Sequence, residues 1–124
     1  MEVGIDFTLE SSLSKIVKNR KYMDFLFTER EISSADRLAP GKQGEYYASR
    51  FCAKEAAAKA LGTGFISKDN IKWKDIEIIG EKGSKPRIEL HNNGKSRLKK
   101  MGYKNIKLSF SHKDNYVVAI VMVY

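Results

Sequence analysis

The sequence predicts an α+β domain in which a mainly antiparallel sheet packs against a long central helix. Residues 50–61 are mostly strong helix formers, and no Gly or Pro interrupts them before Gly62. Residues 116–124 form a nearly continuous apolar run, about half the length of a membrane-spanning helix. Such a run is typical of a strand at the centre of a sheet or at a subunit contact. Shorter alternating segments and helical patterns before it give the expected order β-α-α-α-β-β-α-β-β.

Length and composition indicate one domain that spans residues 1–124. Hydrophobic residues make up 42% of the chain and charged residues 31%, which is an ordinary globular composition. The net charge of +8 predicts an anionic partner, such as a nucleic acid, a phosphorylated small molecule, an acidic protein or a membrane surface. Cys52 is the only cysteine, which excludes an intrachain disulfide and a cysteine metal cluster. The N-terminus lacks the pattern of a secretory signal, so we expect a cytoplasmic protein.

The first strand is predicted by the alternation of residues 3–7. Its apolar side chains share one face, which we expect to be buried: Val3, Ile5 and Phe7. Asp6 then lies on the opposite face, beside a glycine that leaves space near it. A carboxylate at the end of a strand is commonly only a turn or cap residue, so Asp6 alone does not indicate a site.

A basic helix is predicted after this strand. Leu13, Ile16 and Val17 have helical spacing, and a serine at position 11 or 12 can cap the helix start. The opposite face, within residues 15–21, carries four basic side chains: Lys15, Lys18, Arg20 and Lys21. Such a face is either a solvated helix surface or a docking surface for an acidic partner.

The central helix is the most distinctive element. Residues 28–31 fit a capping box that starts a short helix, the pattern breaks near residues 40–41, and the central helix then runs to Leu61. Glu55 and Lys59 are one turn apart, a spacing typical of a surface ion pair. Two features favour a functional role. The helix is rich in alanine, which permits close approach of another backbone or a ligand, and it ends in a Gly-Thr-Gly turn at residues 62–64 whose free amides suit a phosphate.

The second half of the chain is predicted to form a hairpin, a helix and two strands. Residues 71–79 and 86–90 are predicted strands, joined by a turn over residues 80–85. An asparagine at position 92 or 93 caps a short basic helix that ends at Gly102. Residues 106–112 alternate as a strand, and a turn at residues 113–115 leads into the apolar last strand.

Several segments together resemble one known family. Gly4-Ile5-Asp6, the run Arg-Phe-Cys-Ala-Lys-Glu-Ala at residues 50–56 with Lys59-Ala60, and Gly62-Thr63-Gly64 resemble, in that order and spacing, the signature of the holo-[acyl-carrier-protein] synthases. These are the small class of 4′-phosphopantetheinyl transferases. Ser84-Lys85-Pro86 resembles the Gly-Lys-Pro of the family's hairpin, with Ser in place of Gly. Ser109-Phe110-Ser111-His112 resembles its Ser-Ile-Ser/Thr-His strand. The likeness spans nearly the whole chain and implies the 4′-phosphopantetheinyl transferase fold.

The resemblance implies a reaction and a metal site. Family members move 4′-phosphopantetheine from coenzyme A to a serine of an apo acyl carrier protein and release adenosine 3′,5′-bisphosphate, in support of fatty acid biosynthesis. Such phosphoryl chemistry needs charge neutralisation and positioning more than a covalent nucleophile from the enzyme. Asp6 and Glu55 match the family's Mg²⁺-binding carboxylates, and Lys59 matches a phosphate-binding lysine. These three are the expected catalytic residues. The serine proton passes to Glu55 or to a metal-held water, and the sequence does not choose between them.

The resemblance also assigns binding surfaces and an assembly. Together with Lys59, six residues are expected to contact coenzyme A: Arg50, Gly62, Thr63, Lys85, Pro86 and His112. The basic helix within residues 15–21 is expected to dock the acidic carrier protein, through Lys15, Lys18, Arg20 and Lys21. The family implies a homotrimer with active sites between subunits. In a shared site, Asp6 and the basic helix are expected from one subunit, and the Glu55 helix from its neighbour.

Two other functions fit the residues less well. A nucleic-acid-binding module is suggested by the positive charge and by the 12 Phe and Tyr residues, but most of these aromatics have core spacing and the basic residues are scattered. A metal-dependent phosphodiesterase would also use Asp6 and Glu55, but the chain lacks further Asp or His clusters for a second metal. We therefore expect neither a nucleic acid nor a membrane as partner. Coenzyme A with Mg²⁺ should raise the melting temperature, whereas oligonucleotides should not.

Overall fold

The computed structural model describes residues 1–63, 70–80 and 84–124 of the chain. The elements follow the order expected from the sequence. In these residues they are β1 (Glu2–Leu9), η1 (Glu10–Leu13), α1 (Arg20–Leu26), α2 (Glu29–Asp36), α3 (Gln43–Ala60), η2 (Trp73–Asp75), β2 (Ile76–Ile79), β3 (Arg87–Leu90), α4 (Asn92–Lys100), β4 (Ile106–Lys113) and β5 (Tyr116–Val123).

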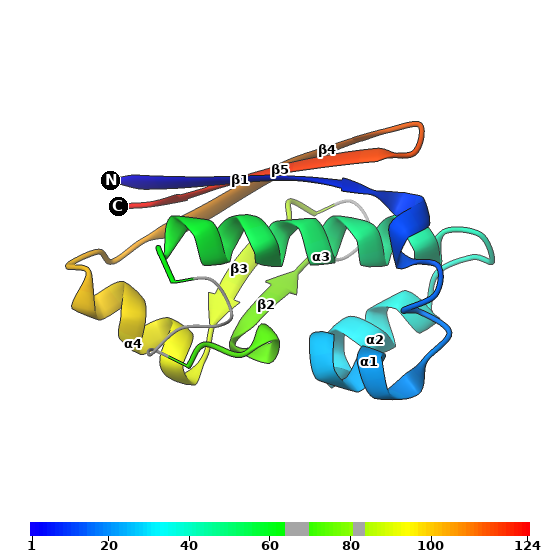
Figure 1. The fold of residues 1–124 in the computed structure, drawn as a ribbon, viewed down its shortest axis with the longest axis horizontal. Helices are drawn as coiled ribbons and strands as arrows, with labels where there is room; N and C mark the ends of the chain where they lie inside the picture. The colour runs from blue at the N-terminus through cyan, green and yellow to red at the C-terminus, as the bar shows by residue number, and fades with distance from the viewer. Residues whose placement is uncertain (64–69, 81–83) are drawn as a thin grey trace.

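Helix α3 runs through the middle of the fold (Figure 1). A three-stranded antiparallel sheet in the order β1-β5-β4 lies along one side of α3, and the hairpin β2-β3 forms a separate two-stranded sheet on the other side. Helices α1 and α2 lie near the N-terminal half of α3, and α4 lies near its C-terminal end. The strands predicted from the sequence therefore form two antiparallel sheets.

Strand β5 is the central strand of the larger sheet, as its apolar sequence predicts. It pairs with β1 from Leu9↔Tyr116 to Glu2↔Val123 and with β4 along its other edge. Alternate side chains of β5 are buried: Val117, Ala119, Val121 and Val123. The side chains between them form part of an outer face that remains partly exposed.

Strand β1 packs on α3 with the face opposite to the expected one. The side chains expected in the core are 46–61% exposed: Val3, Ile5 and Phe7. Gly4 faces α3 instead, and a Cβ atom at this position would lie 1.9 Å from the Ala56 carbonyl oxygen and 2.5 Å from the Ala60 nitrogen. Backbone contact of this kind requires glycine on the strand and alanine on the helix. The alternation was predicted correctly, but this close approach determines which face is buried.

The first α-helix begins later than the sequence predicted. Residues 10–13 form the 3₁₀ helix η1, residues 14–18 form turns, and α1 starts only at Arg20. Asn19 starts it, because its side-chain Oδ1 accepts hydrogen bonds from the amides of Lys21 (3.0 Å) and Tyr22 (3.3 Å). The predicted helix within residues 15–21 is therefore wrong. Its basic residues divide between a turn and the first turn of α1.

The hairpin is shorter than predicted. Residues 73–75 form η2, where the Asp75 carboxylate accepts a hydrogen bond from the Lys72 amide at 3.0 Å, so β2 starts only at Ile76. β3 starts at Arg87, just after Pro86, which has no N–H group for a ladder hydrogen bond. The middle of the predicted turn, residues 81–83, and Gly64 of the Gly-Thr-Gly turn lie outside the described residues.

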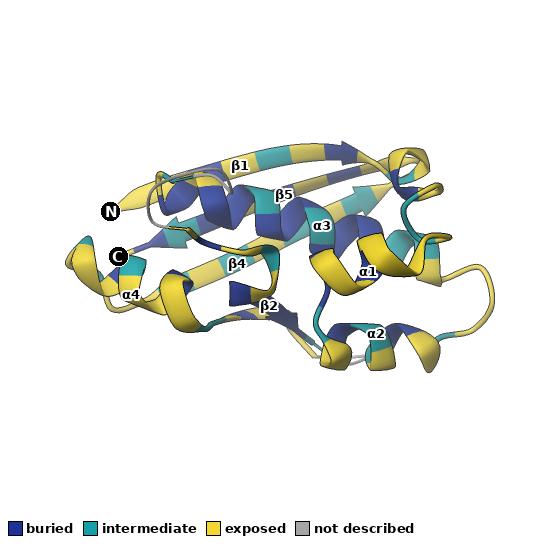
Figure 2. Cartoon of the chain, turned by 60° about the horizontal axis from the view of Figure 1, so that its bottom comes forward, coloured by how far each residue is buried: buried dark blue, intermediate teal, exposed yellow. Residues whose placement is uncertain are grey.

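Most of α3 is buried (Figure 2), including one of its lysines. Lys54 is fully buried, and its Nζ donates to Glu31 Oε1 at 2.8 Å and to the Trp73 carbonyl oxygen at 3.1 Å. Glu31 belongs to the predicted capping box of α2 and also accepts a hydrogen bond from the Ile78 amide at 2.9 Å. This buried ion pair joins α2, α3 and β2 and holds in place the elements that form the larger pocket described below.

Candidate active site

Asp6 and Lys59 meet where β1 crosses the C-terminal half of α3. Lys59 Nζ donates to Asp6 Oδ1 at 3.1 Å and to the Ile5 carbonyl oxygen at 2.9 Å. Thr8 Oγ1 donates to Asp6 Oδ2 at 3.0 Å. Asp6 is only 15% exposed, so both of its oxygens are held by neighbouring groups. Sequence reasoning missed Thr8, although its position two residues after Asp6 places both on one face of the strand.

Glu55 completes the cluster from one turn earlier on α3. Burial raises the pKa of Glu55, the negative charge of Asp6 raises it further, and the positive charge of Lys59 partly opposes both. The two carboxylates therefore repel each other within one chain. This corrects the expectation that a shared site would take Asp6 from one subunit and Glu55 from its neighbour. Two carboxylates close together offer the oxygen ligands that a hard divalent cation prefers, and such a cation would relieve their repulsion.

A larger pocket lies near the N-terminal half of α3. It has a volume of about 720 Å³ and brings together three of the predicted coenzyme A contacts, Arg50, Pro86 and His112. Sequence reasoning missed its other polar and charged lining residues: Ser34, Arg37, Lys42, Glu45, Ser49 and Ser84. They come from α2, the α2–α3 loop, the first turns of α3 and the β2–β3 hairpin, which are far apart in the sequence.

Arg50 is held rigidly at this pocket. Its guanidinium donates to the Gly80 carbonyl oxygen at 3.2 Å and to Ser49 Oγ at 3.0 Å, and it lies 3.9 Å from the centre of the Tyr46 ring. The side chain is 8% exposed, and its Nε is buried without a hydrogen-bond partner among the described residues. Burial lowers the pKa of Arg50 from its ordinary value, although a guanidinium stays protonated in proteins. A buried cation with an unused donor suits an anionic ligand.

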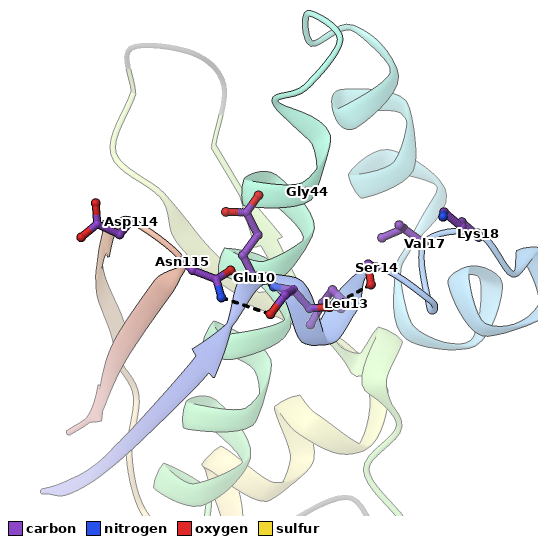
Figure 3. A pocket seen from close by; sticks show the side chains of 9 residues that line it. Glu10, Leu13, Ser14, Val17, Lys18, Gly44, Asp114 and Asn115 are labelled. Atoms are coloured by element: carbon purple, nitrogen blue, oxygen red, sulfur yellow. Dashed lines mark hydrogen bonds between the residues drawn. The ribbon is translucent and has the colours of Figure 1, made fainter.

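His112 lies between two carboxylates. Its Nε2 is 3.1 Å from Glu10 Oε2 and its Nδ1 is 3.3 Å from Glu45 Oε1. Glu10 also lines a smaller cavity of about 470 Å³ between η1 and the β4–β5 turn, where Lys18 and Gly44 lie (Figure 3). No sequence pattern singles out Glu10 or Glu45, because they come from separate elements that meet only in the fold.

The other predicted contacts lie apart from the pocket. The amides of Gly62 and Thr63 donate to the carbonyl oxygens of Lys59 (3.0 Å) and Ala58 (3.3 Å), and these hydrogen bonds cap the C-terminus of α3. This contradicts the expectation that these two amides are free for a phosphate. Lys85 is exposed beside the pocket residues Ser84 and Pro86. The four basic residues expected to dock a carrier are exposed: Lys15, Lys18, Arg20 and Lys21.

A second group of possible metal ligands lies on the hairpin. Atoms of Glu77, Glu89 and His91 lie within 4.8 Å of one another. Each already has a protein partner: Thr28 donates to Glu77, His91 Nε2 lies 3.0 Å from Glu77, and Arg30 lies 3.9 Å from Glu89. Burial raises the pKa of Glu77, but the Thr28 and His91 hydrogen bonds outweigh it, and the net shift is downward. These contacts give the group a structural role, because they connect the start of α2 to the β2–β3 hairpin.

No helix in the described part of the chain is long and apolar enough to cross a membrane.

Comparison with known proteins identifies the family of this chain. Residues 2–121 match the family model of the 4′-phosphopantetheinyl transferase superfamily. The holo-[acyl-carrier-protein] synthase of Alkaliphilus oremlandii is 42% identical over 120 residues, which cover 94% of this chain and 93% of the relative.

Solved structures agree with this result. The structure of holo-[acyl-carrier-protein] synthase from Neisseria meningitidis has a TM-score of 0.85 and 27% identity, and the match covers 99% of this chain and 97% of that one. A holo-(acyl-carrier-protein) synthase from Bacillus anthracis, in complex with CoA (3′,5′-ADP), has a TM-score of 0.78 and 31% identity over 98% of this chain and 94% of that one. The family resemblance and the fold class predicted from the sequence are confirmed. The chain belongs to the 4′-phosphopantetheinyl transferase superfamily.

Proposed function

We propose that this transferase moves 4′-phosphopantetheine from coenzyme A to the serine hydroxyl of an apo acyl carrier protein, with release of adenosine 3′,5′-bisphosphate. The observation that carries the proposal is the cluster of Asp6, Glu55 and Lys59, which places two carboxylates and a cation together in a chain with holo-[acyl-carrier-protein] synthase relatives. In the cell the reaction belongs to fatty acid biosynthesis in the cytoplasm.

The cluster supplies the charges that phosphoryl transfer needs. Lys59 is the phosphate ligand, because its ammonium group lies on the rim of the cluster with 54% of the side chain exposed. Asp6 and Glu55 would hold Mg²⁺, and Thr8 fixes the orientation of Asp6. When bound, the metal neutralises negative charge on the phosphates. Glu55 belongs to this cluster and is a candidate acceptor of the serine proton.

The larger pocket is the proposed site for the nucleotide part of coenzyme A. Its cations Arg37, Lys42 and Arg50 favour phosphate groups, and its volume of about 720 Å³ is within the usual range for small-molecule sites. Pro86 and His112 complete the lining at the hairpin and β4. Lys85 contributes from the rim, while the Gly62-Thr63 turn supports the position of Lys59.

The separation of the two sites supports a homotrimer with shared active sites. From Arg50 to Glu55 the helix advances by about 8 Å and rotates by about 140°, so the pocket and the carboxylate cluster lie on different faces of α3. The outer face of the larger sheet is apolar and exposed, with Phe7 stacked on Tyr116 at 5.4 Å between ring centres. A trimer assembled through this face is the proposed arrangement, in which the pocket of one subunit serves the Asp6 cluster of the next.

The carrier protein is proposed to dock on the turn after η1 and on α1. Lys15, Lys18, Arg20 and Lys21 are exposed there, although Arg20 also pairs with Asp24 at 3.2 Å. The same helix exposes two aromatic side chains, Tyr22 (56%) and Phe25 (64%). Cations beside exposed aromatics suit an acidic protein that also presents apolar groups.

Intact-mass spectrometry tests the function directly. An apo acyl carrier protein incubated with the enzyme, coenzyme A and Mg²⁺ should gain the mass of one phosphopantetheine group. The variants Asp6→Ala and Glu55→Ala should lose this transfer, whereas Glu29→Ala, an exposed carboxylate on α2, should keep it. No mass gain on several carriers from correctly folded protein would refute the proposal.

A further inference from the structure

We propose that Glu10 and Glu45 affect nucleotide binding in opposite directions through His112. Glu10 is a positioning residue that holds the imidazole ring for a phosphate. Glu45 occupies the place of that phosphate in the unliganded enzyme and has to yield to it. This inference rests on the proposed function, because it assigns the larger pocket to the nucleotide part of coenzyme A.

The contacts of His112 use both ring nitrogens. Nε2 meets Glu10 Oε2 at 3.1 Å, and Nδ1 meets Glu45 Oε1 at 3.3 Å. An ionised carboxylate only accepts hydrogen bonds, so the Nε2 hydrogen bond to Glu10 requires a proton on Nε2, and the Nδ1 contact with Glu45 is an ion pair when Nδ1 also carries a proton. The ring is then a cation between two anions. It joins three elements, because Glu10 starts η1, Glu45 is in the first turn of α3, and His112 is near the end of β4.

The two carboxylates lie on different sides of the ring. Glu45 lines the larger pocket together with His112, and it is the one acidic side chain among the described residues that line that pocket. Glu10 lines the smaller cavity instead (Figure 3). The Nδ1 side of the ring therefore faces the proposed ligand, and the Nε2 side faces away from it.

The two carboxylates also differ in how firmly they are held. The backbone amide of Glu10 donates to the Asn115 carbonyl oxygen at 2.9 Å, which ties this residue to the turn that follows β4. The Glu10 side chain is 29% exposed. The Glu45 side chain is 42% exposed, so it has room to rotate toward solvent. An incoming phosphate would replace the more exposed carboxylate at Nδ1 and leave the Glu10 contact in place.

Opposite effects on affinity follow from this arrangement. Loss of the Glu45 charge removes the group that competes with the phosphate for Nδ1, so the nucleotide should bind more tightly. Loss of the Glu10 charge weakens the contact that orients the ring toward the phosphate, so the nucleotide should bind more weakly. A general charge effect would instead strengthen binding of an anion in both variants.

Calorimetric titration with adenosine 3′,5′-bisphosphate separates these cases. We expect Glu45→Gln to lower Kd and Glu10→Gln to raise it, each by about threefold to fivefold, the range for partly exposed charge pairs. Glu2→Gln, which removes an exposed charge at the far end of β1, is the matched control and should leave Kd unchanged. In the background of His112→Asn, the gain from Glu45→Gln should disappear.

Different results would contradict the roles of Glu10 and Glu45 and the assignment of the larger pocket to the nucleotide. Tighter binding in both glutamate variants, unchanged Kd in both, or a Glu45→Gln gain that persists without His112 would overturn the inference alone. Failure of the folded wild-type protein to bind the bisphosphate would overturn the nucleotide assignment, and the inference with it. Melting curves of each variant identify any change in Kd that comes from partial unfolding.

Discussion

Thr8 shows how one hydroxyl group orients a carboxylate of the proposed reaction centre. Its Oγ1 holds Asp6 Oδ2 at 3.0 Å, while Lys59 holds the other oxygen, so the carboxylate is oriented before any ligand arrives. Thr8 is 7% exposed, and valine has nearly the same shape. The hydroxyl therefore acts on Asp6 with little effect on packing.

We predict that Thr8→Val raises the Mg²⁺ concentration needed for half-maximal activity by about tenfold, the lower end of the effect of losing a group that orients a metal ligand. Stability should fall by only about 1 kcal/mol. A titration of transferase activity with Mg²⁺ measures the first effect, and urea unfolding measures the second. Thr8→Ser keeps the hydroxyl and serves as the control. An unchanged Mg²⁺ dependence in the valine variant would show that Asp6 does not need this contact.

Glu55 gives a pH-dependent prediction. Because burial and Asp6 raise its pKa above the unfolded value, the folded state holds the Glu55 proton more firmly than the unfolded state does. The stability linked to that proton is present below the unfolded pKa, near 4.5, and is lost as the pH rises through the folded pKa. Glu55→Gln lacks this loss, so at pH 7 without metal its Tm should exceed that of the wild type.

The comparison requires melting curves between pH 4 and pH 8, with and without Mg²⁺. The Tm difference between Glu55→Gln and the wild type should shrink toward the acidic end, and Mg²⁺ should stabilise the wild type more than the variant. A variant that is less stable than the wild type at pH 7 without metal would mean that the attraction of Lys59 outweighs burial and Asp6.

At the scale of elements, the contact between β1 and α3 places Asp6 beside Lys59. A Cβ atom at position 4 would overlap the Ala56 carbonyl oxygen, so Gly4→Ala must push the strand away from the helix. We predict a loss of about 3 kcal/mol in the free energy of unfolding, at the upper end for overpacking, together with a loss of transferase activity.

Gly44→Ala is the matched control for this substitution. Gly44 lies in the first turn of α3, and the atoms nearest to a Cβ there belong to the Glu10 side chain, with Oε1 at 2.9 Å, and not to the backbone. Replacing a helical glycine by alanine stabilises by about 0.5–1 kcal/mol. Urea unfolding of both variants should therefore give changes of opposite sign, and equal losses would refute the proposed role of the β1–α3 contact.

The proposed docking surface gives a prediction for the region that includes α1. Replacing Lys18 and Lys21 by alanine should raise KM for the carrier protein and leave KM for coenzyme A nearly unchanged. The difference should decrease at high salt, because exposed charges are screened over about 10 Å at 0.1 M. Lys95 and Lys99, two exposed lysines of α4, provide a control pair with the same loss of charge. An equal rise in both KM values would argue against docking at this surface.

The sequence predicted elements best where the pattern is local. The central helix, the capping box of α2 and the central position of β5 follow from composition and spacing, and the structure confirms them. The buried face of β1 did not follow, because it depends on a backbone contact between residues about 50 positions apart. The start of α1 was missed because an asparagine cap outweighed the helical spacing before it.

The same distinction applies to the site. Asp6, Glu55 and Lys59 were identified through a family resemblance, and the structure brings all three together in one chain. Family resemblance did not mark Glu10 and Glu45, since their importance comes only from the fold around His112. The prediction of free amides at residues 62–63 was wrong, because these amides donate hydrogen bonds to carbonyl groups in the last turn of α3.

At the scale of the whole molecule, the apolar outer face of the larger sheet is the feature to explain. Several of its apolar side chains are 38–61% exposed in the single chain: Val3, Ile5, Phe7, Leu9, Tyr116, Val118 and Ile120. A contiguous patch of this kind is unusual on a monomer and typical of a subunit interface. A cyclic trimer would cover it while keeping every subunit equivalent.

The shared site can be tested by mixing two inactive variants. Arg50→Gln keeps the carboxylate cluster but damages the nucleotide pocket, and Glu55→Ala does the reverse. If each active site combines the cluster of one subunit with the pocket of the next, random assembly leaves on average one intact site in four, and each trimer that holds both variants has one intact site in three. Co-expression of the two variants with different tags should therefore recover about a quarter of the wild-type activity.

Each variant expressed alone should be inactive, and neither should lose the trimer. Sedimentation confirms assembly, and purification through both tags in succession enriches the mixed species. A single chain that carries both substitutions, mixed with the wild type, is the control: shared sites predict about a quarter of the wild-type activity, and unshared sites predict about half. Mixed trimers that stay inactive would mean that each chain uses its own pocket with its own cluster. Coenzyme A would then have to reach around α3, between faces about 140° apart.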